Sequence, residues 1–184
     1  MVTKKSKAKE WYSIIAPKVF DNREIGRAIV TEPEQLIGRK ITVGLLELMN
    51  NFNKFYVKFI FRVTKVNGTN AYAEFAGSEV LRDYISRMVL KRVRRIDTVQ
   101  NLETKDGKKV VVKGIAIISK KVKSTIEKTI RSRIKEYLAK EVSEITFDDF
   151  IMELTTDEIK GKVLHEVRKI YPVRNFEIRK TYVA

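Results

Sequence analysis

The chain has 184 residues, of which 43% are hydrophobic, enough for a real core, and it has no Cys, which excludes disulfides, thiol catalysis and Cys-based zinc sites. Its 38 Lys and Arg against 23 Asp and Glu give a formal net charge of +15, so nucleic acid is the first partner to consider. No apolar run is long enough to span a membrane or suits a secretory signal, so a soluble intracellular protein with no membrane contact is expected.

The first ten residues are unusually rich in lysine. The lysines of this segment are Lys4, Lys5, Lys7 and Lys9. Such a composition predicts a flexible basic arm over residues 1–10. Residues 11–184 are then expected to form a single globular domain.

Short elements are predicted for the next part of the chain. Residues 11–16 favour a strand and residues 24–31 a short helix. A turn of helix is expected over residues 34–37, where a glycine follows. Residues 40–48 favour a second strand, which residues 50–53 follow as a turn.

A long strand stands out next because every second residue is apolar. The alternating apolar positions are Phe55, Val57, Phe59, Phe61 and Val63. This period of two predicts a strand with one apolar face. Asn67-Gly68 then suits a tight hairpin, because both positions of a type I′ turn need positive φ, and residues 72–75 would return as a strand.

From Ser78 onwards the apolar residues fall at helical spacing, through Leu81, Tyr84 and Met88. The predicted opposite face of this helix is basic. Its members, at i, i+4, i+7 and i+8, are Arg87, Lys91, Arg94 and Arg95. Residues 97–104 and 109–119 follow as two strands around a hairpin at Asp106-Gly107.

The last third of the chain is predicted to be helical. Ser124 and Glu127 have the spacing of a capping box that opens a helix. Thr146 is expected to cap a short helix. Thr155 and Glu158 have the spacing of a second capping box.

Together these elements predict an α+β fold. Its centre is a small, mostly antiparallel β-barrel of about six to seven strands, with peripheral helices and a C-terminal helical hairpin. The β-rich core spans residues 11–119 and is closed by a final strand at 173–183, while residues 124–170 form a helical insertion.

A search for catalytic chemistry finds no phosphate-binding glycine loop and one histidine, His165, whose helical context favours a solvated side chain. Asp148 and Asp149 suit the first turn of a helix better than a metal site. Asp97 is expected to pair with the arginines just before it. The sequence therefore predicts no catalytic residue, metal or cofactor.

The charge is unevenly distributed along the chain. Residues 82–135 hold 17 Lys and Arg against 5 Asp and Glu, a net charge of +12, whereas residues 136–168 have a net charge of −5. An ordinary solvated face is the alternative, but self-repulsion on this scale costs stability unless a polyanion relieves it. We expect the acidic segment to face solvent or a basic neighbouring protein.

The cations of this zone are the predicted nucleic-acid site. With the lysines of the arm, the candidates are Arg87, Lys91, Arg92, Arg94, Arg95, Lys120, Lys121, Lys123, Lys128, Arg131 and Lys135. Each cation placed near a phosphate releases condensed counterions. The polar face has few of the side chains that read base edges, so contacts with the backbone and shape of structured RNA are favoured over DNA reading.

A series of short motifs runs along nearly the whole chain. These are Trp11-Tyr12-x-Ile14-x-Ala16-Pro17-Lys18-x-Phe20, Ile25-Gly26, Gly38-Arg39, Phe75-x-Gly77, Arg82-Asp83-Tyr84, Thr104-Lys105-Asp106-Gly107, Ile170-Tyr171-Pro172 and Arg179-Lys180. In order and spacing they resemble the archaeal and eukaryotic small-subunit ribosomal protein family "eS one", also called "S three Ae".

This resemblance implies a structural protein, not an enzyme, in the cytoplasm as part of the ribosome. It implies a place on the platform of the small subunit, near the mRNA exit and the 3′ end of the rRNA. The partners it implies are rRNA, neighbouring platform proteins and mRNA near the exit. The short arm and the end after Val183-Ala184 are more similar to archaeal members.

Three other functions compete with this interpretation. A free RNA-binding module or chaperone without a fixed ribosomal place would bind many RNAs with little preference. A nucleic-acid-modifying enzyme would need an activated nucleophile, a metal set or a cofactor loop, none of which the sequence shows. A membrane-surface protein would need a helix with a bulky apolar face.

Overall fold

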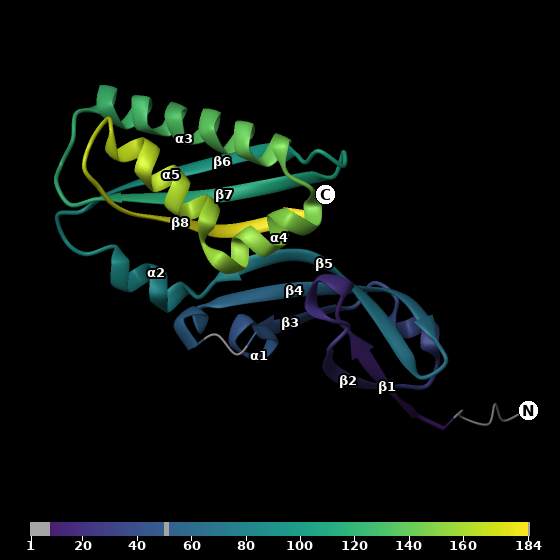
Figure 1. Ribbon diagram of the computed structural model, residues 1–184. Coiled ribbons are helices and arrows are strands. Elements are labelled where there is room, and N and C mark those ends of the chain that lie inside the picture. The colour runs from purple at the N-terminus through teal and green to yellow at the C-terminus, as the bar shows by residue number, and fades with distance from the viewer. Residues whose placement is uncertain (1–7, 50–51, 184) are drawn as a thin grey trace, which may run out of the picture. The chain divides into compact units, whose positions relative to one another are not determined.

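The computed structural model describes residues 8–49 and 52–183 (Figure 1). Two compact units make up the chain. The first consists of Met1–Phe55 and Phe59–Ala76, and the second of Tyr56–Lys58 and Gly77–Ala184. The first seven residues of the predicted arm, and with them Lys4, Lys5 and Lys7, lie outside the described residues.

The first unit is built on strands. They are β1 (Glu10–Ile15), β2 (Glu24–Val30), β3 (Lys40–Gly44) and most of β4 (Val57–Asn67) and β5 (Asn70–Val80). β1 pairs with β2 in antiparallel and with β5 in parallel orientation. β4 pairs with both β3 and β5, so the predicted hairpin at Asn67-Gly68 is confirmed, and Gly68 has the expected positive φ of 57°.

The predicted alternation of β4 produces the core of this unit. Phe59, Phe61 and Val63 are almost fully buried. The rings of Phe20 and Phe61 meet edge to face with centroids 5.7 Å apart, and those of Phe59 and Phe75 at 5.1 Å. Aromatic edge-to-face packing fixes the strand against its neighbours. Phe55, predicted on the same face, lies before the strand and is exposed.

Short helices connect these strands. They are α1 (Leu45–Met49) and 3-10 helices at Lys18–Phe20, Pro33–Leu36 and Phe52–Lys54. The prediction of one strand over residues 40–48 is therefore correct only as far as Gly44. The turn predicted at 50–53 lies partly outside the described residues.

The helix predicted over residues 24–31 is wrong, because this segment forms β2. Ile25, Ile29 and Val30 are β-branched and suit a strand. Pairing with β1 also satisfies the backbone along the segment, from Glu10 opposite Val30 onwards. Tertiary pairing thus overrides a weak local helical pattern.

The second unit combines three long strands with four helices. The strands are β6 (Arg94–Glu103), β7 (Lys109–Ile118) and β8 (Val173–Val183). β7 lies between β6 and β8 and pairs with both in antiparallel orientation, and β8 also pairs with Gly77–Glu79 of β5. The two strands and the hairpin predicted around Asp106-Gly107 and the final strand are confirmed.

The helices of this unit are α2 (Arg82–Met88), α3 (Ser124–Glu144), α4 (Phe147–Thr156) and α5 (Glu158–Arg168). α3, α4 and α5 lie over the β6–β7–β8 sheet (Figure 1). Their buried positions recur at helical spacing. On α3 these are Glu127, Ile130, Ile134, Leu138 and Val142. The predicted helical hairpin is therefore a three-helix segment.

The predicted helix caps have different outcomes. Thr146 caps α4 as expected, since its hydroxyl accepts a hydrogen bond from the Asp149 N–H at 3.3 Å. The capping box at Ser124 is wrong, because α3 starts after Lys123 and Glu127 binds an arginine instead. The box at Thr155 is also wrong, since Thr155 lies inside α4.

The predicted barrel is not confirmed. The eight described strands form a mixed sheet with the order β2-β1-β5-β8-β7-β6, from which β4 and β3 branch. Closure of a barrel requires that the two edge strands pair. Here the path ends at β2 and β6, and the final strand, predicted to close the barrel, instead lies between β5 and β7.

Candidate nucleic-acid interface

The strand pairing of the second unit brings three chain segments to one end of its sheet. Arg94 at the start of β6 pairs with Ile118 at the end of β7, and Ile118 pairs with Val173 at the start of β8. The segments before β6, after β7 and before β8 therefore meet at this end, as Figure 1 shows. The end of α2 joins them, since the Asn175 amide lies 3.1 Å from the Met88 sulfur.

Ten exposed cations gather here, and we call this surface the basic end. Its members are Arg87, Lys91, Arg92, Arg94, Arg95, Lys120, Lys121, Lys123, Lys169 and Arg174. Eight of them were predicted from sequence as RNA-binding residues. The tertiary structure thus joins residues that lie up to about ninety positions apart, which concentrates positive potential on one side of the unit.

The continuous basic helix predicted from Arg87 to Arg95 is wrong. α2 ends at Met88, Arg92 has a positive φ of 68°, and β6 begins at Arg94. The apolar spacing after Ser78 misled, because β5 continues to Val80. The cations still share a surface, but strand pairing rather than a helix face brings them together.

The three cations predicted on α3 lie along this helix beside β6. Lys128 and Lys135 are exposed, whereas Arg131 is half-buried. The Arg131 Nε donates a hydrogen bond to the Asp97 carbonyl at 3.2 Å. Arg131 therefore ties α3 to the edge strand and only partly faces solvent.

Two arginines of the basic end have structural partners. Arg94 forms a two-point ion pair with Glu127, in which its Nη2 lies 3.0 Å from Oε2, and Glu127 is buried. The hydrogen bond and charge of Glu127 raise the pKa of Arg94. Arg95 binds Asp97 at 2.8 Å, so the predicted pairing of Asp97 is correct for Arg95.

The other predicted cations of this unit are available for an external anion. Within residues 8–49 and 52–183 no carboxylate pairs with Arg87, Lys91, Arg92, Lys120, Lys121, Lys123, Lys128 or Lys135. Exposed ammonium and guanidinium groups without internal partners are the groups that bind phosphates. Lys9, which is also exposed, precedes β1 in the first unit.

Sequence reasoning missed Lys169 and Arg174 because they follow the acidic segment. Lys169 binds Glu166 within its own helix end, and Arg174 is exposed at the start of β8. The antiparallel pairing of the final strand with β7 would have indicated their place. That pairing depends on strand order, which the sequence alone did not supply.

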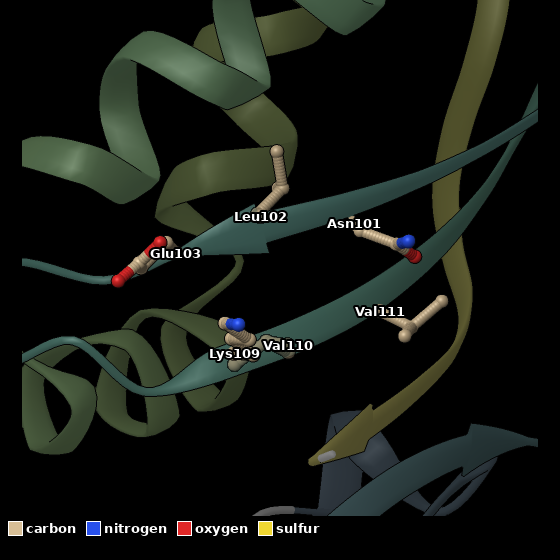
Figure 2. Close-up of a pocket in the computed structure, with 6 residues that line it drawn as sticks. All are labelled: Asn101, Leu102, Glu103, Lys109, Val110 and Val111. Atoms are coloured by element: carbon tan, nitrogen blue, oxygen red, sulfur yellow. The ribbon is translucent and has the colours of Figure 1, made fainter.

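The opposite end of the sheet has a different character. Near the β6–β7 hairpin lies a shallow pocket, whose lining residues appear in Figure 2: Asn101, Leu102, Glu103, Lys109, Val110 and Val111. Glu103 pairs directly across the ladder with Lys109, so one negative and one positive charge share its rim. The Asp106 carboxylate accepts a hydrogen bond from the Phe147 N–H at 2.8 Å, which fixes the hairpin to α4.

No metal site is present among the residues that the structure describes, which hold no group of three His, Asp or Glu side chains suited to an ion. His165 is exposed on α5. Asp148 and Asp149 lie exposed in the first turn of α4, where negative charge opposes the helix dipole favourably. Of the helices in the described ranges, none is both long and apolar enough to span a membrane.

The acidic segment divides into paired and unpaired carboxylates. Glu141 and Glu153 both bind Lys162, and Glu166 binds Arg133 at 3.1 Å. Four other carboxylates are exposed without a cationic partner in the described part of the chain. They are Glu144, Asp148, Asp149 and Glu158.

Comparison with known proteins identifies the family. The chain matches the Ribosomal S3Ae family over residues 1–184. The chain belongs to this family. It is 38% identical over 187 residues to the small ribosomal subunit protein eS1 of Methanopyrus kandleri, covering 100% of this chain and 89% of that protein. Proteins of the same name from Saccharolobus islandicus are 36% identical over 179 residues, covering 97% of this chain and 86% of theirs.

Membership of the Ribosomal S3Ae family confirms the resemblance seen in the sequence motifs, and the relatives are archaeal, as the sequence indicated. It supports a structural role in the ribosome. The family assignment and the basic end are independent observations, since one rests on the whole sequence and the other on where strand pairing places ten cations.

Proposed function

We propose that this protein is a structural constituent of the small ribosomal subunit that binds folded rRNA through the basic end. The observation that carries the proposal is the convergence of three basic segments at one end of the β6–β7–β8 sheet. Folded RNA presents closely spaced phosphates on a rigid surface. A rigid array of cations therefore gains binding free energy without ordering a flexible segment.

The mechanism is passive. The sheet and the three helices over it hold the cations at fixed distances, and the Arg94–Glu127 ion pair fixes β6 to α3. Segments of rRNA that bind different parts of the basic end are thereby held together. The function requires no catalytic residue, metal or cofactor.

We further propose the place of the protein in the subunit, on the basis of the family. It lies on the platform, near the mRNA exit and the 3′ end of the rRNA, beside other platform proteins. mRNA near the exit would be a further partner. The acidic segment, with its four unpaired carboxylates, would face solvent or a basic neighbour, because it cannot favour phosphate.

Sedimentation of the tagged chain in its own cell extract, at low and high monovalent salt, tests this proposal. We expect comigration with the small subunit that persists at high salt. A chain that stays at the top of the gradient, or leaves the subunit at modest salt, would instead favour a free RNA-binding module.

A further inference from the structure

The only tryptophan of the chain is unusually exposed. Trp11 lies in β1 of the first unit, and 63% of its surface is accessible. Its neighbours Tyr12 and Ile14 are buried, so β1 is firmly anchored by its inner face. Trp11 therefore extends from the outer face of a fixed strand rather than from a loose segment.

Other apolar side chains share this outer face. Ile29 of β2 stands directly opposite Trp11 and is 44% exposed. Tyr72 of β5 is the parallel partner of Ile15, two alternations along β1 from Trp11, and is 41% exposed. We call Trp11, Ile29 and Tyr72 the aromatic strip. It crosses three neighbouring strands, β2, β1 and β5 (Figure 1).

Cations flank the aromatic strip. Arg27, opposite Ser13 on the same face, has a side chain that is 67% exposed and uses only its Nε to bind Glu24, at 2.7 Å. Lys9 precedes Trp11 by two positions and is exposed. In the sequence three more lysines stand directly before it, at positions 4, 5 and 7.

We propose that the aromatic strip is a binding site for unpaired bases of single-stranded RNA. Trp11 would stack on a base, with Tyr72 as a second platform, while Arg27 and the lysines before Trp11 bind the adjoining phosphates. Aromatic side chains stack on any base face, and cations follow the backbone, which is the usual combination in single-strand binding. Duplex RNA keeps its base faces stacked inside and offers none to Trp11.

The charges decide between RNA and a protein partner. A purely apolar anchor for a protein would lie in an apolar surround, with charged residues depleted at its core. Here Lys9 and Arg27 lie on either side of Trp11, on the same face of β1 and β2. The site lies within the first unit, and it does not depend on the basic end of the second.

Fluorescence of the full chain provides a direct test, because the signal comes from Trp11 alone. The probes are a single-stranded RNA of about ten nucleotides and a blunt duplex of the same length, at about 0.15 M salt. We expect the single strand to quench Trp11 strongly through base stacking and the duplex to leave it nearly unchanged.

Variants measured with labelled single-stranded RNA extend the test. Trp11→Ala should weaken binding roughly 5- to 100-fold, as expected for loss of one stacked base, and Trp11→Phe should weaken it less. Phe52→Ala is the matched control, since Phe52 is an exposed aromatic of the same unit outside the strip, and it should have no effect. Far-UV circular dichroism checks that every variant is folded.

Three results would overturn the proposal: no quenching by single-stranded RNA, equal quenching by the duplex, or equal losses for Trp11→Ala and Phe52→Ala. A blue shift of Trp11 that occurs only with ribosomal proteins would assign the strip to protein docking. Quenching should persist after Lys91→Ala, Lys120→Ala and Lys121→Ala, which separates this site from the proposed function of the basic end.

Discussion

Lys160 of α5 forms an ion pair with Glu177 of β8, and Glu177 is only 3% exposed. The Tyr84 hydroxyl donates a second hydrogen bond to the same carboxylate at 3.3 Å, and its ring stacks on Tyr56 with centroids 3.8 Å apart. One carboxylate thus joins α5, α2 and β8. This network fixes the helices on the sheet that supports the basic end.

Removal of one partner of this ion pair should destabilise the second unit. Lys160→Met leaves the Glu177 carboxylate buried without its cation, which costs roughly 2 to 4 kcal/mol in the free energy of unfolding. Lys160→Met combined with Glu177→Gln should recover most of this loss, because no buried charge remains and the amide oxygen still accepts from Tyr84. Urea unfolding measures both, and a double variant as unstable as the single one would contradict the explanation.

The same pair predicts a dependence on pH. Burial alone would lower the pKa of Lys160, but the hydrogen bond and charge of Glu177 outweigh it, so the pKa is raised above the ordinary 10.5. A raised pKa stabilises the fold fully below the ordinary value, and the contribution is lost as pH rises through the folded value.

We therefore expect the stability difference between the unaltered chain and Lys160→Met to be equal at about pH 7 and pH 9 and to shrink above about pH 11. Urea unfolding of both chains at each pH measures it. The other lysines titrate in both chains, so their effects cancel. A difference that falls between pH 7 and pH 9 would show that the pKa of Lys160 is not raised.

Gly77 should tolerate no side chain. A Cβ at this position would lie 2.2 Å from the Thr181 carbonyl oxygen of β8, so Gly77→Ala must separate β5 from β8 and should cost about 2 kcal/mol or more. Gly161 is the matched control, because a Cβ there meets nothing within 4 Å. Gly161→Ala should stabilise α5 by about 0.5 to 1 kcal/mol. Thermal unfolding of both variants compares them, and similar melting temperatures would be unexpected.

The basic end should bind rRNA in a salt-dependent way. Lys91→Ala, Lys120→Ala and Lys121→Ala together should lower the slope of log affinity against log salt by about three, one for each phosphate contact. These lysines lack internal partners, so thermal unfolding should hardly change. Arg94 is left in place because it pairs with Glu127.

The control for this prediction lies at the other end of the same sheet. Lys105, Lys109 and Lys140 are exposed, and the Lys105 N–H bonds the Ile145 carbonyl beside the end of α3 at 3.0 Å. Their replacement by Ala removes the same charge from the hairpin end and should leave the salt slope unchanged. Equal slopes for the two triple variants would show that net charge, not the basic end, drives binding.

The acidic segment should matter for protein contacts rather than RNA. Glu144→Gln, Asp148→Asn, Asp149→Asn and Glu158→Gln together remove its unpaired charge, whereas Asp157 is retained because it joins α4 to α5 and binds Lys160. We expect affinity for naked rRNA to stay within about twofold, since these groups do not favour phosphate. Incorporation into small subunits that contain their other proteins should weaken. Unchanged incorporation would mean that the segment faces solvent.

The sequence by itself determined the elements whose signals are local. The alternation at Phe59 and Phe61, the turn glycines at Gly68 and Gly107 and the cap at Thr146 each depend on a few neighbouring residues. The charge zone and the family motifs could also be found in the sequence, because composition and residue order need no geometry.

Only the tertiary structure decided the rest. β2 is a strand because β1 supplies its hydrogen bonds, and the final strand lies inside the sheet because β5 and β7 both pair with it. Lys169 and Arg174 join Lys91 and Lys120 for the same reason. Hydrogen bonds between strands join residues far apart in the chain, and local periodicity carries no information about which strand will be the partner.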